Sequence, residues 1–389
     1  MNPLLEQLNL YPFEKLRNLL ENIKANPSLE EINLTMGEPM HEVPKFIPNI
    51  LTDHYVKLSK YPTTMGTDKV REVCSNWLKD RYSVVVDSKR EVLPVNGSRE
   101  ALFSFTQSIL DTENKETYVV VPNPFYQIYE GAAILAGAKI AYANAYVPRY
   151  IPKWNEIEPN IWKKTQLVFV CTPGNPTGAV MNLQDWAELF ELQKKYGFTI
   201  ASDECYSEIY FSEKPLGVLQ AAQKLDLDFC KKIMFTSLSK RSNLPGLRSG
   251  FVAGDANLIR HFLKYRTYHG SAMSTLVQEV SIAAWQDESH VKNNRALYQE
   301  KFSHIIPMLK REYEITEPDA SFYLWLKVND DLEFTRNLYQ KHSVKVLPGS
   351  YLARETSFGN PGKNRVRIAL VAPLEKCVEA VNRILDYKG

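Results

Sequence analysis

Short runs of apolar residues recur between about residues 91 and 254, separated by stretches that have the period of helices with one apolar face. Continuous apolar runs are typical of strands covered on both faces of a sheet. The expected strands are Val92–Val95, Thr117–Val121, Lys139–Tyr142, Gln166–Cys171, Phe198–Ser202, Lys232–Phe235 and Gly250–Ala253, and the helices between them include Arg99–Asp111, Tyr126–Gly137 and Leu183–Tyr196. The alternation predicts an α/β fold with a mostly parallel, seven-stranded sheet flanked by helices.

The two ends of the chain carry a different pattern. The segments Met1–Glu38 and about Trp285–Gly389 contain separate helical patterns and a few strands, such as Phe322–Val328 and Arg365–Leu370. We interpret them as a smaller α+β domain built from both termini. The expected division is 1–45 and 285–389 for the small domain and 46–284 for the large one, and 389 residues suffice for both.

Composition and charge narrow the class of protein. A net charge of +2 indicates no partnership with nucleic acid or an anionic membrane. The N-terminus lacks a basic stretch followed by an apolar one, and no apolar run is long enough to span a bilayer. The five cysteines are widely spaced, with no CxxC pair or Cys/His cluster, so we expect no metal site, no disulfide framework and a cytoplasmic location.

The strongest candidate for chemistry is Lys240, in the run Ser237-Leu238-Ser239-Lys240 that follows a strand. An imine-forming lysine needs a neutral amine, which burial or cationic neighbours supply. The serine hydroxyls and Arg248, eight positions on, are suited to a phosphate dianion. Taken alone, the run is more typical of a surface loop whose Lys and Arg are solvated.

Asp203 favours the interpretation of Lys240 as an imine-forming lysine over the surface loop. It ends an apolar strand, and the carboxyl ends of parallel strands are where such sheets bind ligands. In a pyridoxal phosphate site a carboxylate must keep the ring nitrogen protonated. Tyr206, three residues later, is placed to reach the ring oxygen. The alternative for Asp203 is a helix N-cap, but the lysine at the end of the next strand favours the cofactor.

Three further segments follow strands. Gly97 and Ser98 open a helix whose free amides attract a phosphate, or they form an ordinary helix cap. Tyr126 is suited to stacking on a pyridine ring or to core packing. Asn175, in the dense turn Pro173–Gly178, is placed to donate its amide to a ring oxygen.

Arg367 lies in the middle of an otherwise apolar strand. A buried cation needs a partner, which is either a substrate carboxylate in a bidentate grip or a buried Asp or Glu of the same chain. Gly37, in Met36-Gly37-Glu38-Pro39, would allow the backbone to approach that carboxylate.

Together these motifs resemble the class I/II aminotransferases of fold type I, in order, in spacing and over essentially the whole chain. The resemblance rests on Asn96-Gly97-Ser98, Pro124-Phe125-Tyr126, Pro173–Gly178, Asp203-Glu204-Cys205-Tyr206, Ser237-Leu238-Ser239-Lys240, Arg248 and Arg367. It implies pyridoxal 5'-phosphate as cofactor, L-glutamate as amino donor and a keto acid as acceptor.

The resemblance also implies residue roles. Lys240 would form the imine with the cofactor and carry a proton, assisted by Asp203 and Tyr206. The cofactor-binding set would be Gly97, Ser98, Arg99, Tyr126, Asn175, Asp203, Tyr206, Ser237, Ser239, Lys240, Arg248 and Tyr61. Tyr61 matches the tyrosine that reaches the phosphate of the neighbouring subunit, which implies a homodimer with active sites at its interface. Gly37, Asn175 and Arg367 would bind the substrate.

Longer strings resemble the N-succinyl-L,L-diaminopimelate aminotransferases of bacterial lysine biosynthesis. These strings are Leu10–Arg17, Asn123–Gly131, Ser202–Phe211, Lys240–Asp255, Tyr265–Ser274 and Leu347–Glu355. The additional carboxylates of that substrate would need basic groups. The candidates are Arg149, Lys153, Arg241, Arg266 and Arg354, for each of which a solvated or ion-paired role is the alternative.

Other functions remain open on the same scaffold. An aspartate or aromatic aminotransferase and a β-lyase share the cofactor residues, because the rest of the site decides the chemistry. A cofactor-sensing regulator is disfavoured because no basic helix-turn-helix pattern precedes the catalytic motifs.

Overall fold

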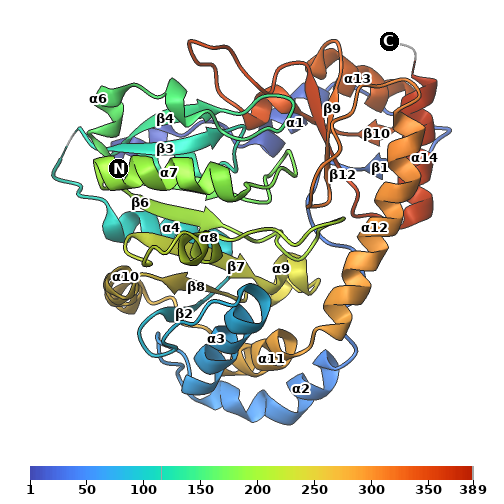
Figure 1. Ribbon diagram of the computed structural model, residues 1–389. Helices are drawn as coiled ribbons and strands as arrows, with labels where there is room; N and C mark the ends of the chain where they lie inside the picture. Colours follow the sequence, from blue (N-terminus) through green and yellow to red (C-terminus); the bar gives the residue numbers. More distant parts are fainter. Residues whose placement is uncertain (115, 388–389) are drawn as a thin grey trace.

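The computed structural model describes residues 1–114 and 116–387, and a seven-stranded sheet lies at its centre (Figure 1). The strand order is β2-β8-β7-β6-β5-β3-β4. The strands are β2 (Val92–Val95), β3 (Tyr118–Asn123), β4 (Lys139–Asn144), β5 (Thr165–Cys171), β6 (Thr199–Asp203), β7 (Lys232–Ser237) and β8 (Gly250–Gly254). Strands β4, β3, β5, β6 and β7 run parallel. The predicted fold class and all seven strands are confirmed.

Strand β8 is the exception to the parallel order, because it pairs antiparallel with both β7 and β2. The chain leaves β7 through α9 (Leu238–Arg241) and the 3-10 helix η4 (Pro245–Leu247) and turns back directly into β8. Parallel neighbours need a longer crossover connection. The return is close: a Cβ on Gly250 would lie 2.3 Å from the carbonyl oxygen of Thr236, so glycine is required there.

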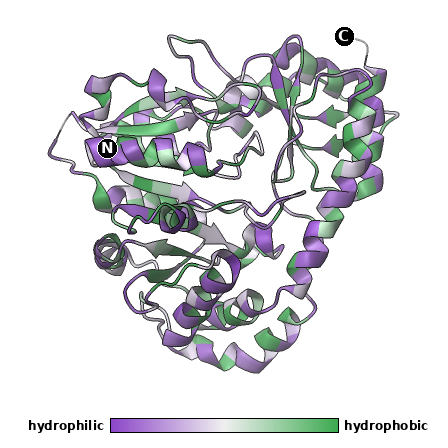
Figure 2. Cartoon of the chain, in the orientation of Figure 1, coloured by the Kyte–Doolittle hydropathy of each residue, from purple (hydrophilic) through white to green (hydrophobic). Residues whose placement is uncertain are grey.

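Helices cover both faces of this sheet, and alternate strand residues face opposite sides. Val120, Val168 and Ile200 pack in one cluster with residues of α3 (Asp68–Tyr82), α7 (Leu183–Tyr196), α8 (Val218–Lys224) and α11 (Thr275–Gln286). Their neighbours Val119, Leu167 and Ala201 pack in a second cluster with α4 (Ser98–Ile109), α5 (Ile128–Leu135) and α10 (Ala256–His269). The helices in Figure 2 accordingly carry both hydrophobic and hydrophilic residues.

A smaller unit is formed by about the last quarter of the chain together with N-terminal residues. Strands β11 (Leu347–Pro348), β12 (Arg365–Ala369) and β9 (Tyr323–Lys327) form an antiparallel sheet, and β1 (Ile32–Asn33) pairs with β10 (Val344–Lys345). Ile32 and Leu34 share one hydrophobic cluster with residues of α12 (Ser289–Leu309), α13 (Asp331–His342) and α14 (Leu374–Asp386). The domain boundaries given above stay a prediction. Helix α12 runs from beside α11 toward α14 (Figure 1).

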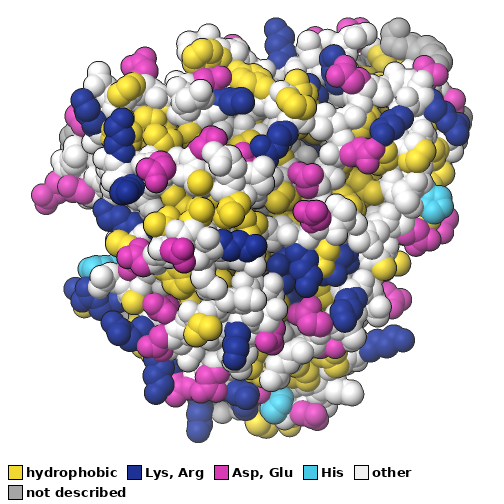
Figure 3. Space-filling view, in the orientation of Figure 1, with side chains coloured by type: hydrophobic (Ala, Val, Ile, Leu, Met, Phe, Trp, Pro, Cys, Tyr) yellow, Lys and Arg dark blue, Asp and Glu magenta, His cyan; other side chains and the backbone are white. Residues whose placement is uncertain are grey.

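The remaining elements are short. They are the helices α1 (Pro12–Leu20), α2 (Ile47–His54) and α6 (Pro159–Trp162) and the 3-10 helices η1 (Pro3–Gln7), η2 (Tyr55–Ser59), η3 (Trp154–Glu156) and η5 (Gly349–Leu352). Of the helices that the structure describes, none is long and apolar enough to cross a membrane. Acidic and basic side chains are interspersed over the face seen in Figure 3.

Candidate active site

The carboxyl ends of β5, β6 and β7 open into a pocket of about 460 Å³. Residues from the N-terminal chain and from strands β9 and β12 complete its wall. The lining residues include Tyr11, Phe13, Met36, Gly37, Glu38, Ser98, Arg99, Tyr126, Asn175, Asp203, Cys205, Tyr206, Ser237, Ser239, Lys240, Arg248, Tyr323 and Arg367. The fold therefore brings twelve of the fourteen predicted site residues together. The other two are Gly97, beside the pocket, and Tyr61, which is fully exposed outside it.

Lys240 enters the pocket from α9, directly after β7. Its Nζ donates to the carbonyl oxygen of Gly37 at 2.5 Å and lies 5.6 Å from the centre of the Phe322 ring. Burial lowers the pKa of the Lys240 amine to about 8, assisted by the Arg367 charge and opposed by the Glu38 carboxylate. An amine with that pKa is partly neutral near pH 7, as imine formation requires. The solvated-loop alternative is wrong for this lysine.

Asp203 ends β6 and is buried. Its Oδ2 accepts from the hydroxyl of Tyr129 at 2.8 Å, and its Oδ1 accepts from the backbone N–H of Cys205 at 3.3 Å. Burial raises the pKa of the Asp203 carboxyl, whereas these donors lower it. The N-cap alternative is wrong, because the next helix, α8, begins at Val218. Among the described residues no cation lies within ion-pair distance of Asp203, so the site suits a ligand cation.

Arg367 is only 4% exposed and points into the pocket from β12. It donates to Oδ1 of Asn175 at 2.9 Å and to the carbonyl oxygen of Thr35 at 2.7 Å, and it stacks 4.4 Å from the centre of the Tyr323 ring. Its buried Nε has no hydrogen-bond partner in the part of the chain that the structure describes. No Asp or Glu in the described part of the chain forms an ion pair with it, so the buried-acid alternative is wrong. A buried cation in this position calls for an anionic ligand.

Two tyrosines that sequence reasoning missed support the site, Tyr323 by lining the pocket and Tyr129 by donating to Asp203. The hydroxyl of Tyr323 lies 3.1 Å from that of Tyr206. A Cβ on Gly37 would lie 1.8 Å from the Tyr323 hydroxyl, so only glycine allows this approach. Tyr129, the partner of Asp203, lies in α5. Both tyrosines occur in predicted apolar segments, where they cannot be told from core residues.

The opposite end of the pocket has the donors that a phosphate needs. Helix α4 begins at Ser98, and its N-cap is Gly97 at φ +84°. A Cβ on Gly97 would lie 2.4 Å from a guanidinium nitrogen of Arg248, so the glycine lets that arginine approach the helix N-terminus. Ser237 lines the same end, with its Oγ 3.7 Å from the sulfur of Cys205. Helix amides, hydroxyls and an arginine are suited to a phosphate dianion.

Tyr126 and Arg99 interact beside the pocket. The Arg99 Nε donates to the Tyr126 hydroxyl at 2.6 Å, and the Tyr126 ring meets that of Tyr129 edge-on, 5.8 Å between centres. The stacking of Tyr126 on the cofactor stays a prediction.

The basic residues considered for distal carboxylates lie outside the pocket. Four of them form ion pairs: Arg149 with Asp185, Arg241 with Glu288, Arg266 with Glu100, and Arg354 with Glu130. The ion-paired alternative therefore holds for these four.

Comparison with known proteins agrees with this geometry. Residues 30–384 match the family described as aminotransferase class I and II, so the chain belongs to this family, whose members depend on pyridoxal 5'-phosphate. A crystal structure of an aminotransferase from Neisseria meningitidis is 56% identical, with a TM-score of 0.97 and 99% of each chain covered. The aminotransferase AspB from Helicobacter pylori is 32% identical, with a TM-score of 0.90, and the match covers 98% of this chain and 99% of that one.

The names of some similar proteins include a substrate. The LL-diaminopimelate aminotransferase of Maridesulfovibrio salexigens is 30% identical over 386 residues, which cover 96% of this chain and 95% of the relative. That relative carries the name of the free diaminopimelate, without the succinyl group expected from the longer strings.

Proposed function

We propose that this aminotransferase exchanges an amino group between L-glutamate and the succinylamino-oxo-heptanedioate of lysine biosynthesis, which makes it an N-succinyl-L,L-diaminopimelate:2-oxoglutarate aminotransferase. The observation that carries the amino-acid site is Arg367, a buried cation that faces the same pocket as the Lys240 amine and forms no ion pair with an acid among the described residues. The diaminopimelate skeleton is supported by the names of the relatives.

The residues at the phosphate end and along β6 would hold the cofactor. Ser98, Ser237, Ser239 and Arg248 bind its phosphate, and Tyr206, kept in place by Tyr323, donates to its ring oxygen. When bound, the cofactor supplies a cationic ring that withdraws electrons from the substrate Cα.

The remaining residues act on the substrate or on the ring nitrogen of the cofactor. Arg367 and Asn175 grip the α-carboxylate, and because Oδ1 of Asn175 already accepts from Arg367, its amide nitrogen is left to donate. Asp203 keeps the proton on the ring nitrogen. Lys240 Nζ, in its neutral form, takes the proton from the substrate Cα as a general base. A pKa of about 8 matches that task near neutral pH.

A second candidate substrate is L,L-diaminopimelate itself. The relatives carry its name, and the pocket contains Glu38, a carboxylate that would favour a distal ammonium group. Succinylation replaces that ammonium by a neutral amide and adds a carboxylate, so the two substrates differ in charge at the far end of the site.

The substrate proposal predicts a clear preference in a panel of amino acceptors. With glutamate as donor, kcat/KM for the succinylated keto acid should exceed that for oxaloacetate or phenylpyruvate by about 10²-fold, because the shorter acceptors lack the remote groups whose binding energy lowers the barrier. A reverse assay compares N-succinyl-L,L-diaminopimelate with L,L-diaminopimelate. A preference for oxaloacetate, phenylpyruvate or the free diaminopimelate contradicts the substrate but keeps the transaminase, whereas release of pyruvate and ammonia from an amino acid indicates a β-lyase.

The proposed role of Arg367 predicts a loss of substrate binding in Arg367→Lys. The substitution keeps the charge but loses the two parallel donors, so kcat/KM for glutamate should fall about 10²-fold, mainly through KM. Arg365→Lys, two residues away on the same strand, is the matched control and should stay within twofold of wild type. Equal effects in both variants would argue against a carboxylate grip at Arg367.

We also propose that the enzyme is a homodimer in which Tyr61 reaches the site of the neighbouring subunit. Tyr61 is fully exposed, and Tyr55, Val56 and Leu58 just before it are each about 60% exposed. Exposed apolar patches of this kind mark interaction surfaces.

Among the described residues all five cysteines are free, which supports the expected cytoplasmic location.

A further inference from the structure

The loop that carries Gly37 needs an anchor outside itself. Residues 36–46, hereafter the Gly37 segment, supply three lining residues of the pocket and the carbonyl oxygen that accepts from Lys240. Between residues 36 and 43 the segment forms neither helix nor strand. A loop without backbone pairing stays in place only if its side chains hold it.

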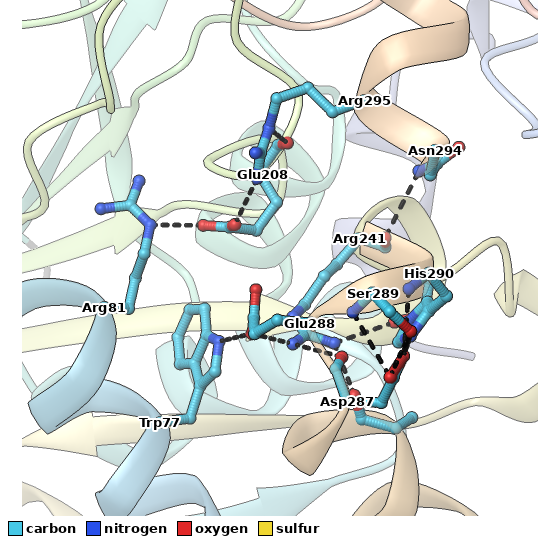
Figure 4. A network of polar contacts seen from close by, with 12 residues as sticks. Trp77, Arg81, Glu208, Arg241, Asp287, Glu288, Ser289, His290, Asn294 and Arg295 are labelled. Carbon is cyan, nitrogen blue, oxygen red and sulfur yellow. Dashed lines mark hydrogen bonds and ion pairs between the residues drawn. The ribbon is translucent and has the colours of Figure 1, made fainter. Parts of the chain in front are cut away.

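His41 provides that anchor by contacting two residues of helix α12. Its Nδ1 lies 2.8 Å from Oδ1 of Asn294, and its Nε2 lies 2.7 Å from Nζ of Lys301. The Asn294 amide nitrogen donates in turn to the backbone carbonyls of Lys240 and Arg241, at 3.2 and 3.3 Å. Figure 4 shows Asn294 reaching from α12 to the backbone of Arg241.

The direction of every hydrogen bond in this series, hereafter the hydrogen-bond chain, is fixed by the groups at its two ends. Two carbonyl oxygens can only accept, so the group of Asn294 that faces them is the amide nitrogen, and its oxygen faces His41. His41 must then carry its proton on Nδ1, which leaves Nε2 as an acceptor for Lys301. Lys301 also donates to the carbonyl oxygen of Val371. Donation thus runs one way, from Lys301 through His41 and Asn294 to the backbone of Lys240.

Burial makes the hydrogen-bond chain costly to break. Asn294 is 4% and Lys301 3% exposed, and the His41 ring packs 4.5 Å from that of Tyr298. Burial lowers the pKa of His41, which agrees with the neutral ring that the hydrogen bonds require. A buried donor or acceptor that loses its partner destabilises its surroundings more than an exposed one.

We infer that Lys301, His41 and Asn294 are positioning residues for the Lys240 amine. The chain fixes Lys240 from two sides, because it holds the Gly37 carbonyl against Nζ and binds the backbone carbonyl of Lys240 itself. Asn294 is the shared member, since it contacts both the Gly37 segment and helix α9. The inference rests on the proposed role of Lys240 as the proton-carrying amine.

Kinetics of matched variants test this inference. Asn294→Ala and His41→Phe, which keeps a ring against Tyr298, should each lower kcat about tenfold and leave KM for glutamate within twofold, because Arg367 and Asn175, the side chains that grip the carboxylate, lie outside the Gly37 segment. The double variant should lose no more than either single one, since both break the same chain. Asn293→Ala, the exposed neighbour on α12, is the control and should match wild type.

Limited proteolysis of the holoenzyme gives a readout that needs no substrate. Trypsin cleavage between Lys45 and Phe46, at the end of the Gly37 segment, should be about tenfold faster in Asn294→Ala and His41→Phe than in wild type and Asn293→Ala. Equal cleavage rates in all four proteins, or kcat losses that multiply in the double variant, would overturn the inference. An inactive wild type would overturn the proposed function instead, and the cleavage rates would still decide whether the chain holds the segment.

Discussion

Lys240→Ala should lower kcat by about 10⁴-fold while the protein stays folded. The substitution removes the only lysine amine among the described residues that line the pocket, and a positioned acid–base group contributes roughly 10²–10⁴-fold on its own. Few contacts are lost from the fold, since Nζ donates to one backbone carbonyl, that of Gly37. Steady-state kinetics with glutamate measure the effect, and thermal unfolding checks that the variant is native.

Lys232→Met is the matched control for this variant. Lys232 begins the strand that Lys240 follows, and it is likewise buried, with its pKa lowered by burial. Its Nζ donates to the carbonyl oxygen of Cys230, at the end of β7 remote from the pocket. We expect kcat of Lys232→Met within threefold of wild type. If Lys240→Ala transaminated at the wild-type rate, the assignment of Lys240 as the proton-carrying amine would be wrong.

Asp203→Asn should lower kcat by about 10²–10³-fold, the range observed when a preorganised electrostatic partner is removed. Asparagine fills nearly the same space and can still accept from Tyr129, but it carries no negative charge. It therefore cannot keep the proton on the ring nitrogen of the cofactor. Kinetics with glutamate, together with the absorbance of the bound cofactor, report the loss.

Glu204→Gln is the control for Asp203→Asn, because it removes a carboxyl group that is buried in the core and does not face the cofactor ring. Glu204 is the next residue and is also buried, but it turns away from the pocket and accepts from the backbone N–H of Val218 and from Ser202. Burial raises the pKa of its carboxyl to about 7, so glutamine replaces a group that is already half protonated near neutral pH. We expect less than a threefold change in kcat, and a loss equal to that of Asp203→Asn would contradict the proposed role of Asp203.

The sequence predicts most of this fold because its signals are local. Buried parallel strands leave continuous apolar runs, and polar residues at their carboxyl ends stand out against them. Lys240 and Asp203 were identified in this way. Arg367 was identified for a related reason, since a charge within an apolar strand is costly unless a partner meets it.

The residues that escaped prediction depend on contacts between distant segments. Tyr129 and Tyr323 look like core aromatics until the fold places their hydroxyls beside Asp203 and Tyr206. The contact of His41 with Lys301 joins residues 260 positions apart, and neither residue lies in a motif that predicts it. The ion pairs of Arg149 and Arg354 are equally nonlocal, so the sequence could not tell an ion-paired arginine from one that binds a substrate carboxylate.

The central claim is that the Lys240 amine binds the cofactor covalently. Borohydride reduction of the holoenzyme, followed by proteolysis and mass spectrometry, tests it most directly, because reduction fixes the cofactor on the nitrogen that holds it. The account predicts one modified peptide, with the added mass on Lys240. Modification of a different lysine, or protein that gains neither colour nor mass after incubation with pyridoxal 5'-phosphate, would contradict it.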